Sequence, residues 1–168
     1  NYLVIVIDGM AASGKTTLAK EIAKKLDANF IHTDDFYLPP NLRTDERLHQ
    51  LCCNIDYERL QSEVLEHIND NILYHKFDCK QMKQTEQVRL NYKKILIIEG
   101  AYSMHPILGS YYDLSIYLKI TSTKQEDRIL KRDGITQLEK FKEKWIPLER
   151  QYFDKYMIEN KADIVINN

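Results

Sequence analysis

Residues 9–17 read Gly-Met-Ala-Ala-Ser-Gly-Lys-Thr-Thr, and this stretch constrains the fold more than any other part of the chain. The apolar run 3–7 precedes it, and Leu18, Ile22 and Leu26 follow it on one helical face. A strand, a glycine-rich loop and a helix in this order form a phosphate-binding loop, because glycines let backbone N–H groups turn toward phosphate oxygens. Residues 9–17 are called the phosphate loop below.

Two side chains of the phosphate loop predict a nucleoside triphosphate with a metal ion as the ligand. Lys15 would reach the outer phosphates, and the Thr16 hydroxyl would ligate Mg²⁺. We therefore expect a nucleoside triphosphate with Mg²⁺ beside it; the loop by itself fits a GTPase, an ATPase or a kinase equally, and ATP is the phosphoryl donor expected for a kinase. The residues expected to hold the nucleotide are Gly9, Met10, Ala11, Ala12, Ser13, Gly14, Lys15, Thr16 and Thr17.

The remaining apolar pattern predicts an α/β fold. Short strand-like runs alternate with helix-period segments, as in a parallel sheet covered by helices on both faces. With 168 residues and 43% hydrophobic content, the chain suits a single domain over residues 1–168. The strand-like runs are residues 2–7, 29–32, 95–99, 114–120 and 162–166.

Two apolar stripes predict core-facing helices. Pro147 lies inside the second stripe, so we expect a kink or a break near Trp145–Ile146. The polar segments 37–55 and 74–93 follow no clear period and are expected to build a substrate pocket beyond the strand ends. The first stripe comprises Leu60, Val64, Ile68 and Ile72, and the second Leu138, Phe141, Trp145, Leu148, Tyr152 and Tyr156.

Composition limits the classes of partner that the chain is expected to bind. A net charge of −1 without a basic block gives no indication of nucleic acid, and the apolar runs are too short for a membrane helix. The expected partner is a small molecule, the expected location is cytoplasmic, and homo-oligomerisation is left open. Cys52, Cys53 and Cys79 form neither a disulfide framework nor a zinc pattern, and we expect small, partly buried thiols.

Two acidic positions follow strand-like runs. Asp34 and Asp35 come after the second run, where a carboxylate could accept the proton of an acceptor hydroxyl. The alternative is a helix cap or an Asx turn. Glu99 ends the third run, directly after four apolar residues. In phosphate-loop enzymes an acid at this place holds Mg²⁺ opposite the loop hydroxyl, so Thr16 and Glu99 are the expected metal ligands.

Two later motifs each allow a plain explanation. Arg128 and Arg132 share a helix face and could close over the phosphates, or they could pair with Asp127 and Asp133 on a solvated face. Residues 160–163 read Asn-Lys-Ala-Asp, like the guanine-reading motif of GTPases. They precede the last strand-like run rather than follow it, so we interpret them as a chance match.

With these parts in order, the chain resembles the uridine kinase and phosphoribulokinase group of P-loop kinases over almost its whole length. The resemblance implies a three-layer α/β/α fold with sheet order 2-3-1-4-5 and a short helical lid. It also implies Asp34 as the catalytic base, with Lys15, Arg128 and Arg132 as further catalytic residues. Tyr37 would border a nucleoside and Asp56 would bind its ribose hydroxyls. The segments that carry the resemblance are 9–17, 33–39, 54–57, 98–102 and 128–133, followed by the helix around Trp145.

The chain departs from this group at the segment with which members of the group recognise a pyrimidine base. Its members carry a histidine in a hairpin, and the comparable residues 77–82 contain none. The leading hypothesis is a kinase that phosphorylates the 5′-hydroxyl of uridine or cytidine. One alternative is another small alcohol, such as a vitamin precursor or a sugar phosphate, with Arg43 and Arg47 available for a phosphorylated acceptor. The other is a regulatory nucleotide-binding protein without turnover.

Overall fold

The computed structural model describes residues 2–168, and a parallel sheet of five strands lies at its centre. The strands lie side by side in the order β2-β5-β1-β6-β7, which is 2-3-1-4-5 when these five are numbered along the chain. The predicted α/β fold and strand order are therefore confirmed. The strands are β1 (Leu3–Gly9), β2 (Asn29–His32), β5 (Ile95–Glu99), β6 (Leu114–Lys119) and β7 (Ile164–Asn167).

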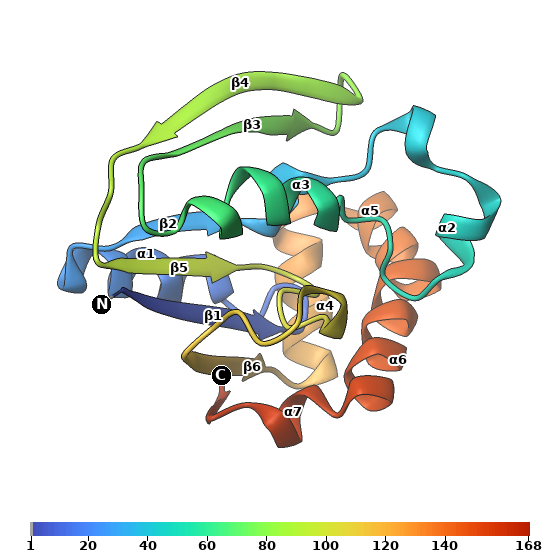
Figure 1. The fold of residues 1–168 in the computed structure, drawn as a ribbon. Helices are drawn as coiled ribbons and strands as arrows, with labels where there is room; N and C mark the ends of the chain where they lie inside the picture. The colour runs from blue at the N-terminus through green and yellow to red at the C-terminus, as the bar shows by residue number, and fades with distance from the viewer. Residues whose placement is uncertain (1) are drawn as a thin grey trace.

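Helices pack on both faces of this sheet (Figure 1). Successive residues of a strand point to opposite faces, so Val4 and Val6 of β1 join one buried cluster while Ile5 and Ile7 join another. The helices are α1 (Lys15–Leu26), α2 (Asp45–His49), α3 (Tyr57–Glu63), α4 (Ser122–Asp133), α5 (Ile135–Lys140), α6 (Ile146–Tyr156) and α7 (Ile158–Lys161). Helix α1 supplies Ala19 and Ala23 to the second cluster, and α3 and α6 supply side chains to the first.

The first predicted helix ends early, and a two-stranded antiparallel hairpin follows it. The expected stripe ran to Ile72, but α3 ends at Glu63, and Ile72 opens strand β3 (Ile72–Asp78), which pairs with β4 (Lys83–Leu90). In β3 alternate side chains such as Ile72 and Tyr74 are buried, as expected for a strand with one buried face. The prediction of one helix through Ile68 and Ile72 was wrong. Figure 1 shows this hairpin beside α3, outside the central sheet.

The helical segment from α5 to α6 is irregular near Pro147, as the position of this proline predicted. A π-helical stretch, Phe141–Trp145, joins α5 to α6, and Pro147 lies in the first turn of α6. Proline is tolerated there because it donates no hydrogen bond. The regular α-helix is thus interrupted next to Trp145–Ile146, as expected.

The three thiols lie in different surroundings. Cys52 and Cys53 are buried, whereas Cys79 at the hairpin turn is exposed, so its expected partial burial was wrong. Burial raises the pKa of the Cys53 thiol above its ordinary value. Within residues 2–168 no helix combines the length and apolarity needed to span a bilayer.

Strand β5 is followed by a glycine that allows two chain segments to approach closely. Gly100 has φ of 140°, and a Cβ atom there would lie 2.0 Å from Oγ1 of Thr33, the residue that follows β2. Gly109 also has a positive φ, 69°, but a Cβ there would meet no atom within 4 Å. The close approach holds the ends of β2 and β5 together, where Asp34 and Glu99 lie.

We predict that Gly100→Ala destabilises the fold by about 1–3 kcal/mol more than Gly109→Ala, because only the first adds overpacking to backbone strain. Urea unfolding of both variants measures the difference in free energy of unfolding. Equal losses would show that the Thr33 contact yields without cost.

Candidate functional site

The phosphate loop closes around its own lysine. Gly9 and Gly14 have φ of 142° and 102°, which L side chains rarely adopt. Between them the chain wraps so that Lys15 Nζ donates to the carbonyl oxygens of Gly9 (2.9 Å) and Met10 (2.8 Å). The ammonium group is thus fixed at the start of α1, at the carboxyl end of β1.

The turn into α1 has the properties of an anion cradle. The cap residue of this helix is Gly14, and within residues 2–168 no side chain caps it. The Ser13 hydroxyl is buried and has no hydrogen-bond partner in the same part of the chain. Free N–H groups at a helix N-terminus, with the positive end of the helix dipole, favour phosphate.

The predicted metal pair is in direct contact. Thr16 Oγ1 donates to Glu99 Oε1 at 2.9 Å, although the two residues belong to α1 and β5. Glu99 is 3% exposed, and its Oε1 also contacts Nδ1 of His32 at the end of β2. The hydrogen bond with Glu99 raises the pKa of the His32 imidazole. Sequence reasoning missed His32; its position just before the acidic pair was the available signal.

The two neighbouring aspartates separate in the structure. They lie in a short 3₁₀-helix, Thr33–Phe36, rather than in a strand. Asp34 is exposed and accepts from the Tyr37 hydroxyl at 3.2 Å. Asp35 is half-buried, accepts from Tyr74 on the hairpin at 3.1 Å, and has its pKa raised by burial. Of the pair, Asp34 is therefore free to meet an acceptor, while Asp35 ties the hairpin to the strand end.

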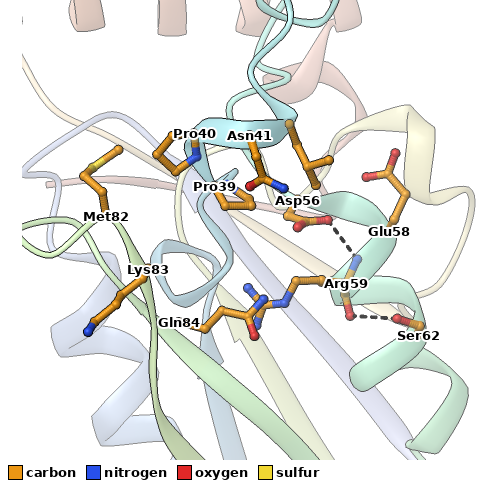
Figure 2. Close-up of a pocket in the computed structure, with 11 residues that line it drawn as sticks. Pro39, Pro40, Asn41, Asp56, Glu58, Arg59, Ser62, Met82, Lys83 and Gln84 are labelled. Carbon is orange, nitrogen blue, oxygen red and sulfur yellow. Dashed lines mark hydrogen bonds between the residues drawn. The ribbon is translucent and has the colours of Figure 1, made fainter.

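Asp56 lines a cavity at the base of α3. Its carboxylate caps this helix by accepting from the Arg59 N–H at 3.1 Å, and burial raises its pKa. The cavity has a volume of about 570 Å³ and lies between α3, the segment after Tyr37 and the start of β4. Figure 2 shows Asp56 and Arg59 with Pro39 on one side and Met82 on the hairpin side.

Arg43 and Arg47, the two arginines considered for binding a phosphorylated acceptor, differ in their hydrogen bonds. Arg47 makes a bidentate pair with Glu58, with N···O distances of 2.7 and 2.6 Å. Arg43 donates through Nε to the Leu38 carbonyl at 2.7 Å. Bidentate pairing occupies the guanidinium face that would recognise a phosphate, so Arg43 is the better placed of the two.

The lid arginines also differ. Arg128 donates through one guanidinium nitrogen to the carbonyls of Ala12 (3.1 Å) and Ser13 (3.4 Å), so it lies against the phosphate loop. Arg132 pairs with its neighbour Asp133 at 2.8 Å and is largely exposed. The structure thus brings one of the two predicted arginines to the loop and leaves the other on the solvated face.

A buried polar network beneath the phosphate loop was missed by sequence reasoning. Asp8 is fully buried and accepts from the Gly9 N–H (2.7 Å), the Met104 N–H (3.0 Å) and the Tyr152 hydroxyl (2.7 Å). Burial raises the pKa of Asp8, and these hydrogen bonds oppose the rise. A second buried acid, Glu149, contacts the loop separately by accepting from the Ala11 N–H at 2.9 Å. An acidic residue at the end of an apolar run was a signal at Asp8, as it was at Glu99.

Residues 160–163, which match the guanine-reading motif, contain an aspartate that forms hydrogen bonds between two strands. Asp163 accepts from the backbone N–H of Ser115 at 2.8 Å and from its hydroxyl at 2.6 Å. It therefore joins the start of β7 to β6.

Comparisons with known proteins agree with this arrangement. The sequence profile of the cytidylate kinase family matches residues 5–98, more than half of the chain. A probable gluconokinase from Dictyostelium discoideum is 32% identical over 114 residues, covering 59% of this chain and 56% of the relative. Uridine-cytidine kinase C from the same organism is 27% identical over 123 residues, covering 69% of this chain and 26% of the relative. The chain thus spans little more than half the length of the first and about a quarter of the second.

A solved structure has the same fold over nearly the whole chain. The structure of a possible uridine kinase from Bacillus stearothermophilus has a TM-score of 0.72 and 19% identity, covering 99% of this chain and 89% of that one. The expected resemblance to this group of P-loop kinases is confirmed. With its family profile matched from the first strand to the end of β5, the chain belongs to the cytidylate kinase family of P-loop proteins.

Proposed function

We propose that residues 1–168 act as a single kinase domain that transfers the γ-phosphoryl group of ATP, with Mg²⁺, to a hydroxyl of a small molecule. The proposal rests above all on Asp34, an exposed carboxylate at the same sheet edge as the phosphate loop and the Thr16–Glu99 pair. Phosphoryl transfer needs such a carboxylate to accept the proton of the attacking hydroxyl and to orient its oxygen.

The donor half of the site fits a triphosphate and a divalent cation. The uncapped start of α1 and the buried, unpartnered Ser13 hydroxyl offer donors to phosphate oxygens. The hydroxyl of Thr16 and the carboxylate of Glu99 are oxygen ligands of the kind that Mg²⁺ prefers. Mg²⁺, when bound, would neutralise charge that develops on the phosphates.

Within this scheme each residue has a separate task. Lys15 would exchange its two carbonyl partners for phosphate oxygens, and Thr16 and Glu99 would hold the metal. Asp34 would take the hydroxyl proton, and Arg128 would bring positive charge from the lid to the loop. The contact of His32 with Glu99 would keep that carboxylate oriented toward α1.

We further propose a nucleoside, uridine or cytidine, as the acceptor, phosphorylated at its 5′-hydroxyl. Two similar proteins are named as a uridine-cytidine kinase and a possible uridine kinase. Asp56 has the chemistry to accept from vicinal sugar hydroxyls, and the cavity beside it has room for a ring. Tyr37, bonded to Asp34, would border the acceptor.

A second candidate is another small polyol or a phosphorylated alcohol. The gluconokinase relative, 32% identical, supports an acceptor without a base. Arg43, whose terminal guanidinium nitrogens are not used in its bond to Leu38, supports an anionic group on the acceptor.

Asp34→Asn is expected to lower the rate of transfer by about 10²–10⁴-fold, because the amide cannot accept the proton. Nucleotide affinity should stay unchanged, since the phosphate loop is intact. The control is Asp35→Asn, which removes a charge from the adjacent residue that bonds Tyr74. Turnover with labelled ATP and calorimetric binding of ATP measure the two effects. A pure nucleotide-binding protein would show no transfer in the wild type and no change in either variant.

The acceptor is tested with labelled ATP against uridine, cytidine, gluconate and a sugar phosphate. We expect transfer to a nucleoside, and its absence with both nucleosides would contradict the nucleoside proposal. Arg43→Ala distinguishes a phosphorylated acceptor from a nucleoside. Arg47→Ala is the matched control, because that arginine is held by Glu58. A loss caused by Arg43→Ala only with the phosphorylated acceptor would favour an anionic substrate.

A further inference from the structure

Helix α6 brings a buried carboxylate against the phosphate loop. Glu149 is 3% exposed, and its Oε2 accepts from the backbone N–H of Ala11 at 2.9 Å. The two residues are 138 positions apart in the chain. A buried carboxylate is costly unless it is hydrogen-bonded, so its place beside the loop is itself constrained.

Helix α4 completes this contact from the other side. Gln125 is fully buried, and its Nε2 donates to Glu149 Oε1 at 2.6 Å and to the Ala11 carbonyl at 3.1 Å. Side chains of two different helices therefore hold both backbone polar groups of Ala11. The Oε1 atom of Gln125 has no hydrogen-bond partner among residues 2–168.

The same face of α6 holds the residue before the loop. Tyr152, three residues after Glu149, donates to Asp8, and Asp8 in turn accepts from the Gly9 N–H. Residues three apart share a helix face. One surface of α6 thus fixes the loop both at its entry and at Ala11.

Apolar packing adds to this support. Ala11 and Ala12 pack against a buried cluster of Ile129, Leu138 and Ile146, which come from α4, α5 and α6. Holding a loop in its binding conformation lowers the entropy lost when a ligand binds. The loop between Gly9 and Lys15 is therefore braced by the lid helices rather than by its own residues alone.

We propose that Glu149 is a positioning residue of the phosphate loop, which through Ala11, and together with Gln125, holds the loop in the conformation that binds the triphosphate. The inference rests on the proposed function for its ligand but adds a residue outside the motif. It assigns Glu149 to the affinity for the donor nucleotide and not to the acceptor or to proton transfer.

The test measures ATP·Mg²⁺ binding by calorimetry and KM for both substrates in Glu149→Ala, Glu149→Gln and Gln125→Leu. We expect Glu149→Ala to weaken ATP binding by about 10-fold or more, because a hydrogen bond to a charged group is lost. Gln125→Leu should weaken it less, since Glu149 still holds Ala11. Glu149→Gln should stay close to the wild type, because its amide oxygen can accept from Ala11 and a flipped Gln125 can present its Oε1.

The control is Asp154→Asn, which removes a charge from the exposed side of the same helix and should change nothing. KM for the acceptor should be unchanged in every variant, which a general loss of fold would not allow. If Glu149→Ala does not fold, Gln125→Leu and Glu149→Gln still decide the matter.

Three outcomes would overturn the inference. The first is ATP binding at wild-type affinity in the folded Glu149→Ala and Gln125→Leu variants. The second is a Glu149→Gln loss as large as that of Glu149→Ala, which would assign the effect to charge and not to hydrogen-bond geometry. The third is a parallel rise in both KM values. Failure of the proposed function is distinct, because the wild-type chain would then transfer no phosphoryl group, whereas calorimetry would still compare ATP binding between the wild type and the variants.

Discussion

Glu99 is paired with Ile7 on one side and His32 on the other in the register of three parallel strands, and this pairing brings together the strand ends from which the phosphate loop and Asp34 extend. Parallel strands end at the same edge of a sheet. The phosphate loop that follows β1 and the acidic 3₁₀-helix that follows β2 therefore flank the end of β5. Gly100 permits this arrangement, because any larger residue would meet Thr33 there.

The sequence predicted the parts of the site that depend on local order along the chain. Strand, loop and helix are contiguous around residues 9–17, an apolar run ends at Glu99, and Asp34 lies two residues after another strand, so short patterns were sufficient. The helix expected through Ile72 was wrong because the four-residue apolar spacing continues past the end of α3 at Glu63, through a 3₁₀ turn and into the first residue of β3. The partner strand β4 was not recognised, since most of its side chains are exposed and its apolar alternation is weak.

The missed residues depend on long-range packing. Glu149 and Gln125 lie in helices whose sequences have an ordinary amphipathic pattern. The residues next to them along the chain give no indication of a contact with Ala11. The partners are more than a hundred residues away, and only the fold brings them together. The same holds for Tyr152, whose stripe predicted a core-facing position but not a hydrogen bond to Asp8. Buried polar contacts of this kind carry no local sequence period.

The lid and the loop form one physical unit on the donor side, and this has a consequence for the acceptor side. Arg128 donates to the carbonyls of Ala12 and Ser13, so the lid already adds positive charge to the loop through contacts with its backbone. The hairpin is attached to other elements, through the bond of Tyr74 to Asp35 and through Arg59 of α3, which donates to the His75 carbonyl at 2.5 Å. In the proposed function, the donor and acceptor elements come together at the sheet edge, where Glu99 and Asp34 lie. On the proposed function, we expect substitutions in the hairpin to affect the acceptor more than the phosphate loop, because the side chains that hold Ala11 come from α4 and α6.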